Sequence, residues 1–104
     1  MNWYVASLLF ESTHSTASSE EALWEERHLL LAAPDEQAAN LMAIQAGNEG
    51  QVAYEGENRD QITWTFREVE RVHRVESDDL QSGVEIFSRF LKETEAKSLL
   101  TKFS

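Results

Sequence analysis

The chain contains no cysteine, a single proline and only four glycines in 104 residues. Without cysteine it has no disulfide, no thiolate nucleophile and no cysteine-bound zinc or iron–sulfur site. This absence fits a reducing compartment, and we expect the protein to be cytoplasmic. The scattered glycines form no phosphate-binding loop, and no other motif predicts a cofactor.

Long hydrophobic runs are also missing. No segment approaches the roughly 20 apolar residues that a membrane span requires, so we expect no membrane association. Residues 1–4 lack the basic region of a signal peptide and resemble the start of a strand. The length predicts a single domain over residues 1–104.

Basic residues are few, since nine Lys and Arg accompany nineteen Asp and Glu, and the net charge is −10. Such a charge repels phosphate backbones, and no basic patch with interleaved aromatic residues is present. We therefore expect no nucleic-acid partner. The acidic surface fits high solubility, or attraction of a basic protein partner.

Two extended segments open the chain. Residues 3–12 carry apolar side chains on both faces up to Phe10, which predicts a central strand. Residues 23–33 continue in the same way until Pro34, because the residue before a proline avoids the helical region. Between the two strands the sequence is small and polar and predicts a loop.

Three more strands are expected in the second half. Residues 51–55 and 61–76 flank a turn-forming stretch and predict a hairpin. In the longer strand the ITWTF run alternates clearly and then changes phase, which predicts a bulge near residues 67–68. Residues 84–91, with the sequence VEIFSRFL, are predicted as the last strand.

Two helices complete the prediction. The first runs from about Asp35 to Ala46, with acidic residues near its positive end. A second, short helix is expected over residues 93–103. The predicted packing face of the first helix consists of Ala38, Leu41, Met42 and Gln45, extended by Ala39 and Ala46.

The resulting fold class is α+β. The expected order is strand, strand, helix, strand, strand, strand, helix, with a mostly antiparallel five-stranded sheet. The main helix should pack on one sheet face. The other face is solvated, covered by the last helix, or buried by a second copy of the chain.

Three short motifs occur in a familiar order: Leu9-Phe10-Glu11, the Trp64-x-Phe66 strand, and Phe87-Ser88-Arg89. Together they resemble a bacterial family catalogued as domain of unknown function 4288. Members open with an aromatic-led strand and end with a strand containing Tyr-Ser-Arg, so Phe87 departs from the usual tyrosine. The resemblance implies a bacterial, cytoplasmic protein and implies no activity.

Glu11, Ser88 and Arg89 form the candidate binding pocket. If the strands that carry them are neighbours, the carboxylate and the guanidinium meet as a partly buried ion pair. That pair either fixes the strand register or belongs to a pocket that recognises an anion or a peptide, with Arg89 supplying its planar fork. Ser88 lies in no nucleophile-elbow motif, so the sequence does not support a hydrolase.

Trp24, Glu25 and Glu26 form the candidate interface, because an aromatic side chain surrounded by acidic ones suits a basic partner. Local packing at a strand end is the alternative. The three histidines, His14, His28 and His73, have no ligand spacing, and we predict no metal site.

Three functions remain open, and no residue is predicted to be catalytic. The first is a non-enzymatic protein-interaction domain, homodimeric or similar in size and charge to toxin-neutralising immunity proteins. The second is a small-molecule-binding or enzymatic domain with a sheet-lined cleft around Glu11 and Arg89. The third is an acidic mimic of nucleic acid.

Overall fold

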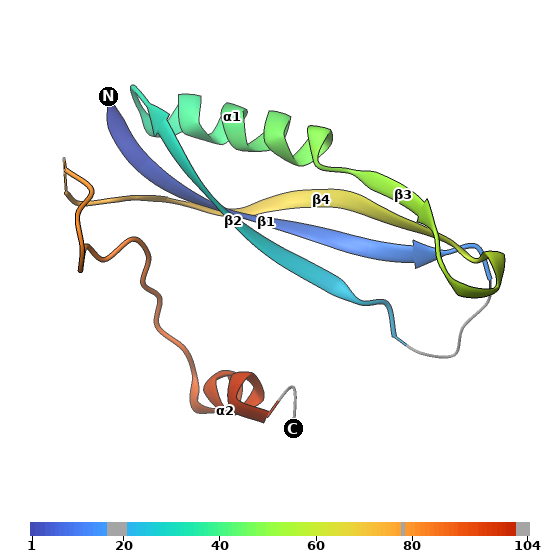
Figure 1. Cartoon of the computed structure of the whole chain (residues 1–104). Coiled ribbons are helices and arrows are strands. Elements are labelled where there is room, and N and C mark those ends of the chain that lie inside the picture. Colours follow the sequence, from blue (N-terminus) through green and yellow to red (C-terminus); the bar gives the residue numbers. More distant parts are fainter. Residues whose placement is uncertain (17–20, 78, 102–104) are drawn as a thin grey trace.

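The computed structural model describes residues 1–16, 21–77 and 79–101. The fold is α+β, as predicted, with a four-stranded sheet in the order β2-β1-β4-β3 and every neighbouring pair antiparallel (Figure 1). The elements in chain order are β1 (Asn2–His14), β2 (Trp24–Ala33), α1 (Glu36–Glu49), β3 (Val52–Glu55), η1 (Glu57–Arg59), β4 (Gln61–Arg74) and α2 (Glu93–Thr101).

The prediction of a fifth strand over residues 84–91 is wrong. These residues belong to no helix and no strand, so the chain order contains one strand fewer than expected. Phe87 contacts side chains of both β2 and β4, so this segment crosses a face of the sheet. An alternating apolar pattern indicates extended chain facing a surface, but a strand also needs a backbone edge to pair with.

Helix α1 begins where the sequence predicts. The carboxylate of Asp35 caps it by accepting a hydrogen bond of 2.8 Å from the backbone N–H of Ala38. The helix continues to Glu49, three residues beyond the predicted end. Gly50 then closes it with a backbone N–H that bonds to the carbonyls of Ala46 and Gly47.

The predicted packing face of α1 is wrong in its centre. The buried residues are Ala39, Ala43 and Gly47, whereas Leu41 and Met42 are 60% and 39% exposed. Small residues at a spacing of four allow the helix to lie close to the sheet. At Gly47 the approach is so close that a Cβ atom would lie 2.5 Å from the Phe66 ring.

The hydrophobic core lies between α1 and the sheet. Its centre is Phe10 and Leu8 of β1, each 1% exposed, packed with Ala6 and Ala43. The neighbouring strands contribute the surrounding side chains Leu29, Leu31, Trp64, Phe66, Val69 and Val72. Tyr4, Ala33 and Ala39 extend the core along the helix.

Strand β4 contains the predicted bulge and a second one. The register with β1 shifts between Leu9 and Phe10 and again between Ser7 and Leu8, so Arg67 and Glu70 have no direct partner. Each extra residue reverses the alternation of side chains. As a result Phe66, Val69 and Val72 all face the same core although they follow one another at intervals of three residues.

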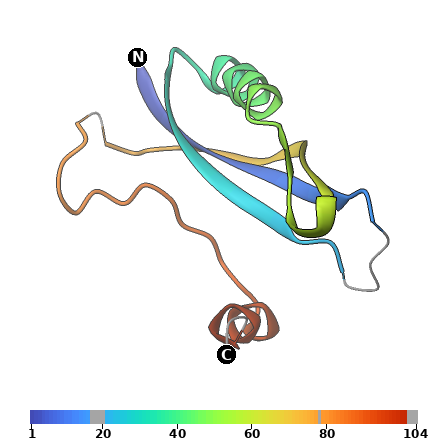
Figure 2. The same ribbon diagram turned by 45° about the vertical axis from the view of Figure 1, so that its right-hand side comes forward.

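After β4 the chain turns and crosses the side of the sheet opposite α1 (Figure 2). We call this sheet face the open face, and residues 84–101 the C-terminal segment. Its helix α2 stands away from the sheet in both views (Figures 1 and 2). The radius of gyration is therefore 16.7 Å, compared with about 13 Å for a compact domain of 100 residues.

Candidate functional site

The centre of the open face is buried although neither α1 nor α2 covers it. Val5 is 2% exposed and Ser7 is fully buried, and alternation places both opposite the α1 core. In the register, Ser7 pairs with His28 on one side and Arg71 on the other. Val5 pairs with His73 of β4, so three basic side chains surround these two residues.

Phe87 of the C-terminal segment covers this centre. Its ring centroid lies 5.5 Å from that of His28 and 5.7 Å from that of His73, with both imidazoles edge-on to the ring. The guanidinium carbon of Arg71 lies 5.1 Å from the same centroid. We call His28, Arg71, His73 and the buried Ser7 the Phe87 socket.

The charges around the socket are partly balanced. Nε2 of His28 lies 3.1 Å from a carboxylate oxygen of Glu26, and Arg71 lies 3.6 Å from Glu70. Cations and edge-on rings near an aromatic face each contribute on the order of 1 kcal/mol. The Ser7 hydroxyl has no hydrogen-bond partner in the described part of the chain. The socket surrounds an aromatic side chain with two imidazoles and one guanidinium.

A family model described as Domain of unknown function (DUF4288) matches residues 3–88. The chain belongs to this family. The resemblance predicted from the three short motifs is thereby confirmed, and the match includes Phe87 while α2 lies beyond it. No curated protein and no solved structure shows significant similarity to the chain.

The predicted pocket of this DUF4288 domain is distributed over two regions. Glu11 of β1 accepts a hydrogen bond of 2.9 Å from Nε of Arg67, the bulged residue of β4. Arg89 instead lines a shallow depression of about 380 Å³ with Leu91 and residues of α2. Ser88 is exposed beside it. The arginine beside Glu11 is thus Arg67, and a pocket that joins Glu11 to Arg89 stays a prediction.

The predicted interface residues lie at the start of the edge strand β2. Trp24 is 49% exposed and pairs in register with Glu11 on the open face. Glu25 forms an ion pair with Arg27 on the α1 side of the strand, and Glu26 pairs with His28. Both carboxylates therefore have basic partners within the DUF4288 domain, and binding of a basic protein here stays a prediction.

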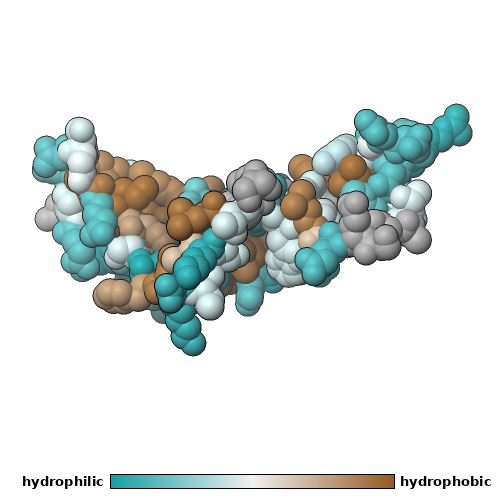
Figure 3. Space-filling view, turned by 90° about the horizontal axis from the view of Figure 1, so that it is seen from below, coloured by the Kyte–Doolittle hydropathy of each residue, from teal (hydrophilic) through white to brown (hydrophobic). Residues whose placement is uncertain are grey.

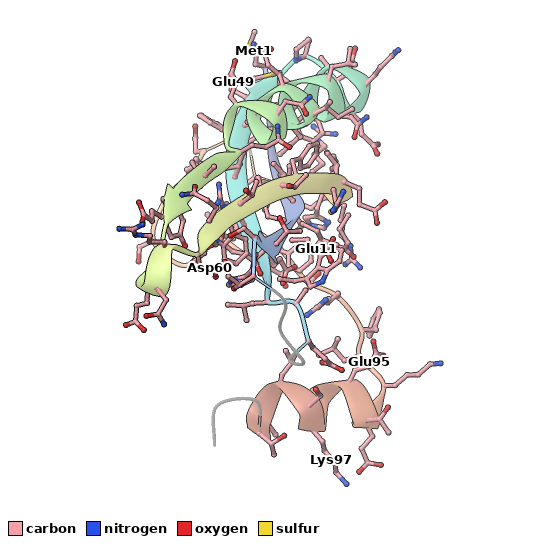
Figure 4. All side chains as sticks on the ribbon, turned by 90° about the vertical axis from the view of Figure 1, so that its right-hand side faces the viewer. Met1, Glu11, Glu49, Asp60, Glu95 and Lys97 are labelled. Atoms are coloured by element: carbon pink, nitrogen blue, oxygen red, sulfur yellow. The ribbon has the colours of Figure 1, made fainter. Side chains whose placement is uncertain are left out.

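A polar cluster that the sequence did not predict closes the end of the sheet near the β3–β4 hairpin (Figure 4). Nδ1 of His14 donates to a carboxylate oxygen of Asp60 across 2.6 Å. The other oxygen accepts from the Ser15 hydroxyl at 3.2 Å and from the Thr16 N–H at 3.1 Å. His14 and Asp60 are 46 residues apart in the sequence. They come into contact because His14 ends β1 and Asp60 directly precedes β4, and these two strands are neighbours.

The hydrogen bond from His14, with those from Thr16 and Ser15, lowers the pKa of Asp60 from 3.8 to about 2. Because the folded-state pKa is below the ordinary value, this group stabilises the fold above pH 3.8, and the contribution disappears as the pH falls toward about 2. We expect Asp60→Asn to have a lower urea midpoint than the unmodified chain at neutral pH. This difference should disappear as the pH falls.

The test compares urea unfolding of the unmodified chain, Asp60→Asn and the neighbouring control Glu57→Gln over this pH range. The difference between the first two should shrink as the pH falls. A difference that stays constant would contradict the assignment.

The sequence contains only part of the signal for the Phe87 socket. Arg71 and His73 are two residues apart in one strand, so alternation alone places them on one face. Their meeting with His28 depends on the pairing of both strands with β1.

Among residues 1–16, 21–77 and 79–101, no helix is long and apolar enough to cross a membrane. In those same ranges no three His, Asp or Glu side chains gather as metal ligands.

Proposed function

We propose that this DUF4288 chain is a protein-interaction domain that pairs with a second copy of itself through the C-terminal segment. The observation that carries the proposal is the exposure of this segment. Phe90 is 106% exposed and Leu100 is 83% exposed, and Ile86, Leu91 and Leu99 are exposed by 38–51%. Contiguous apolar side chains of this kind characterise interaction surfaces, and Figure 3 shows apolar side chains gathered on this side of the molecule.

The charge of this segment is compatible with docking on the rest of a chain. Residues 84–101 contain three basic and three acidic side chains, whereas residues 1–83 contain five basic and sixteen acidic ones. The C-terminal segment is therefore neutral overall, and the acidic remainder of a second copy does not repel it. In its own chain α2 stands apart from the sheet (Figure 4).

A second copy is the occupant that satisfies both surfaces. The open face exposes Trp24 and Leu30 on β2, which are 49% and 47% exposed. Each chain thus carries a C-terminal segment with uncovered apolar side chains and an open face whose edge strand exposes two large apolar side chains. Two copies related by a twofold axis bury both surfaces twice, which is the usual arrangement of homodimers.

The same proposal places the protein in the cytoplasm of a bacterium. It rests on the absence of cysteine, which fits a reducing compartment, and on the family resemblance described above. An interaction domain has no need of a catalytic residue, and we assign none.

The test is sedimentation velocity of three variants at equal concentrations. We expect Phe90→Asp and Leu100→Asp to weaken dimerisation roughly a hundredfold each, because burial of one such side chain contributes about 2–3 kcal/mol. Leu41→Asp is the matched control, since Leu41 is 60% exposed on α1, away from the segment. Equal association of all three variants and the unmodified chain would overturn the proposal.

A further inference from the structure

The contact that holds the C-terminal segment to the sheet is narrow. Phe87 packs against His28, Arg71 and His73. Three residues later, Phe90 lies entirely in solvent. Within the described residues the ring contacts of the segment with the sheet are those of Phe87, and Ile86 and Phe90 on either side of it are exposed.

The chain before the segment can redirect it. Residues 79–83 are all exposed and end in Gly83, whose φ of 90° lies in the left-handed region. The backbone N–H of Val84 donates to the Gln81 carbonyl, which makes a single local turn. Opening this turn loses few contacts, and a short turn between a docked segment and its domain is where exchange between copies occurs.

From these observations we propose that the Phe87 socket receives Phe87 of the second copy in the dimer, and that the two chains exchange their C-terminal segments. This inference rests on the proposed function. The socket is identical in both copies, so Phe87 makes the same ring contacts after exchange. Exchange also places the exposed apolar side chains Ile86 and Phe90 of one chain beside the other chain, so both C-terminal segments contribute to the contact between the two copies.

The experiment mixes two variants that fail for opposite reasons. Phe87→Ala has an intact socket but no ring to insert, and the double variant His28→Thr/Arg71→Thr has the ring but a broken socket. Threonine keeps the strand propensity of β2 and β4. Each variant alone should dimerise at least about tenfold more weakly than the unmodified chain, since each loses both ring contacts.

In an equimolar mixture, one chain supplies the ring and the other the socket. Exchange therefore predicts that native mass spectrometry detects the heterodimer well above its statistical share. A heterodimer at the statistical share overturns exchange but leaves dimerisation intact. Without exchange, Phe87 binds only the socket of its own chain, so mixing the two variants restores no ring contact. Absence of any dimer of the unmodified chain overturns the proposed function itself.

A second measurement does not depend on the folding of these variants. A photoreactive phenylalanine analogue at position 87 reacts with the side chains that surround its ring. Exchange predicts a covalent dimer on a denaturing gel after irradiation, with the cross-link to the strand containing His28 or the strand containing Arg71. A cross-link found only within single chains contradicts exchange.

Discussion

Phe10→Ala is expected to lower the free energy of unfolding by about 3–5 kcal/mol, the range for loss of a buried aromatic side chain. Phe10 is 1% exposed, its ring lies 5.6 Å from that of Phe66, and the Arg27 guanidinium stacks 3.9 Å above it. Removal of the ring leaves a cavity beneath α1 and exposes the stem of Arg27. Because domains of this size are stable by only about 5–15 kcal/mol, the variant should be partly unfolded at physiological temperature.

Urea unfolding followed by circular dichroism measures this loss, at one fixed protein concentration so that dimerisation does not change between samples. Leu41→Ala is the control, since this leucine lies on the exposed side of α1, and its effect should stay within about 0.5 kcal/mol. Similar losses in the two variants would mean that α1 packs through the leucine face, as the sequence pattern predicts, and that the described core is wrong.

The second prediction is that replacing serine by alanine at two positions of β1 changes the free energy of unfolding in opposite directions. Ser7→Ala should raise the free energy of unfolding by about 1–2 kcal/mol, because it removes a buried hydroxyl that lacks a partner. Ser7 is fully buried, and its oxygen makes no hydrogen bond among the described residues. Alanine fills almost the same space without the desolvation cost.

Ser12→Ala should instead lower the free energy of unfolding by about 1 kcal/mol. Ser12 is 3% exposed, and its hydroxyl donates to the Leu23 carbonyl across 2.8 Å. The same denaturation series compares both variants with the unmodified chain. Destabilisation by both substitutions would show that the Ser7 hydroxyl has a partner on the open face.

The sequence predicts the sheet well where one face is a continuous core. The apolar pattern of residues 3–12 indicates a central strand, and β1 lies between β2 and β4. The phase change after Phe66 correctly indicates a bulge, because one inserted residue is enough to reverse the alternation of a paired strand. Asp35 marks the start of α1 for an equally local reason, since its side chain caps the helix directly.

Features that depend on distances between elements are not visible in the pattern. Leu41 and Met42 are more hydrophobic than Ala43 and Gly47, so the sequence favours them for the core. At Gly47 the Phe66 ring leaves no room even for a Cβ atom. The pattern of residues 84–91 predicts a strand, but Phe87 contacts the sheet through its side chain while Ile86 and Phe90 are 51% and 106% exposed.

The candidate site shows the same limit. The sequence predicts that Glu11 meets Arg89 across neighbouring strands, whereas the ion pair in the structure joins Glu11 to Arg67 at the bulge. In the sequence His28 and His73 are separate strand histidines. They share a site only because Ser7 and Val5 of β1 stand between their strands, a fact of register that no single segment contains.

The most direct test of this account is the molar mass of the unmodified chain in solution, by light scattering over a dilution series. If the chain dimerises through its C-terminal segment, we expect twice the chain mass of 11.9 kDa at the higher concentrations and the mass of the monomer after dilution. A mass of one chain at every concentration would contradict it, because Phe90 and Leu100 would then remain exposed without a second copy to cover them.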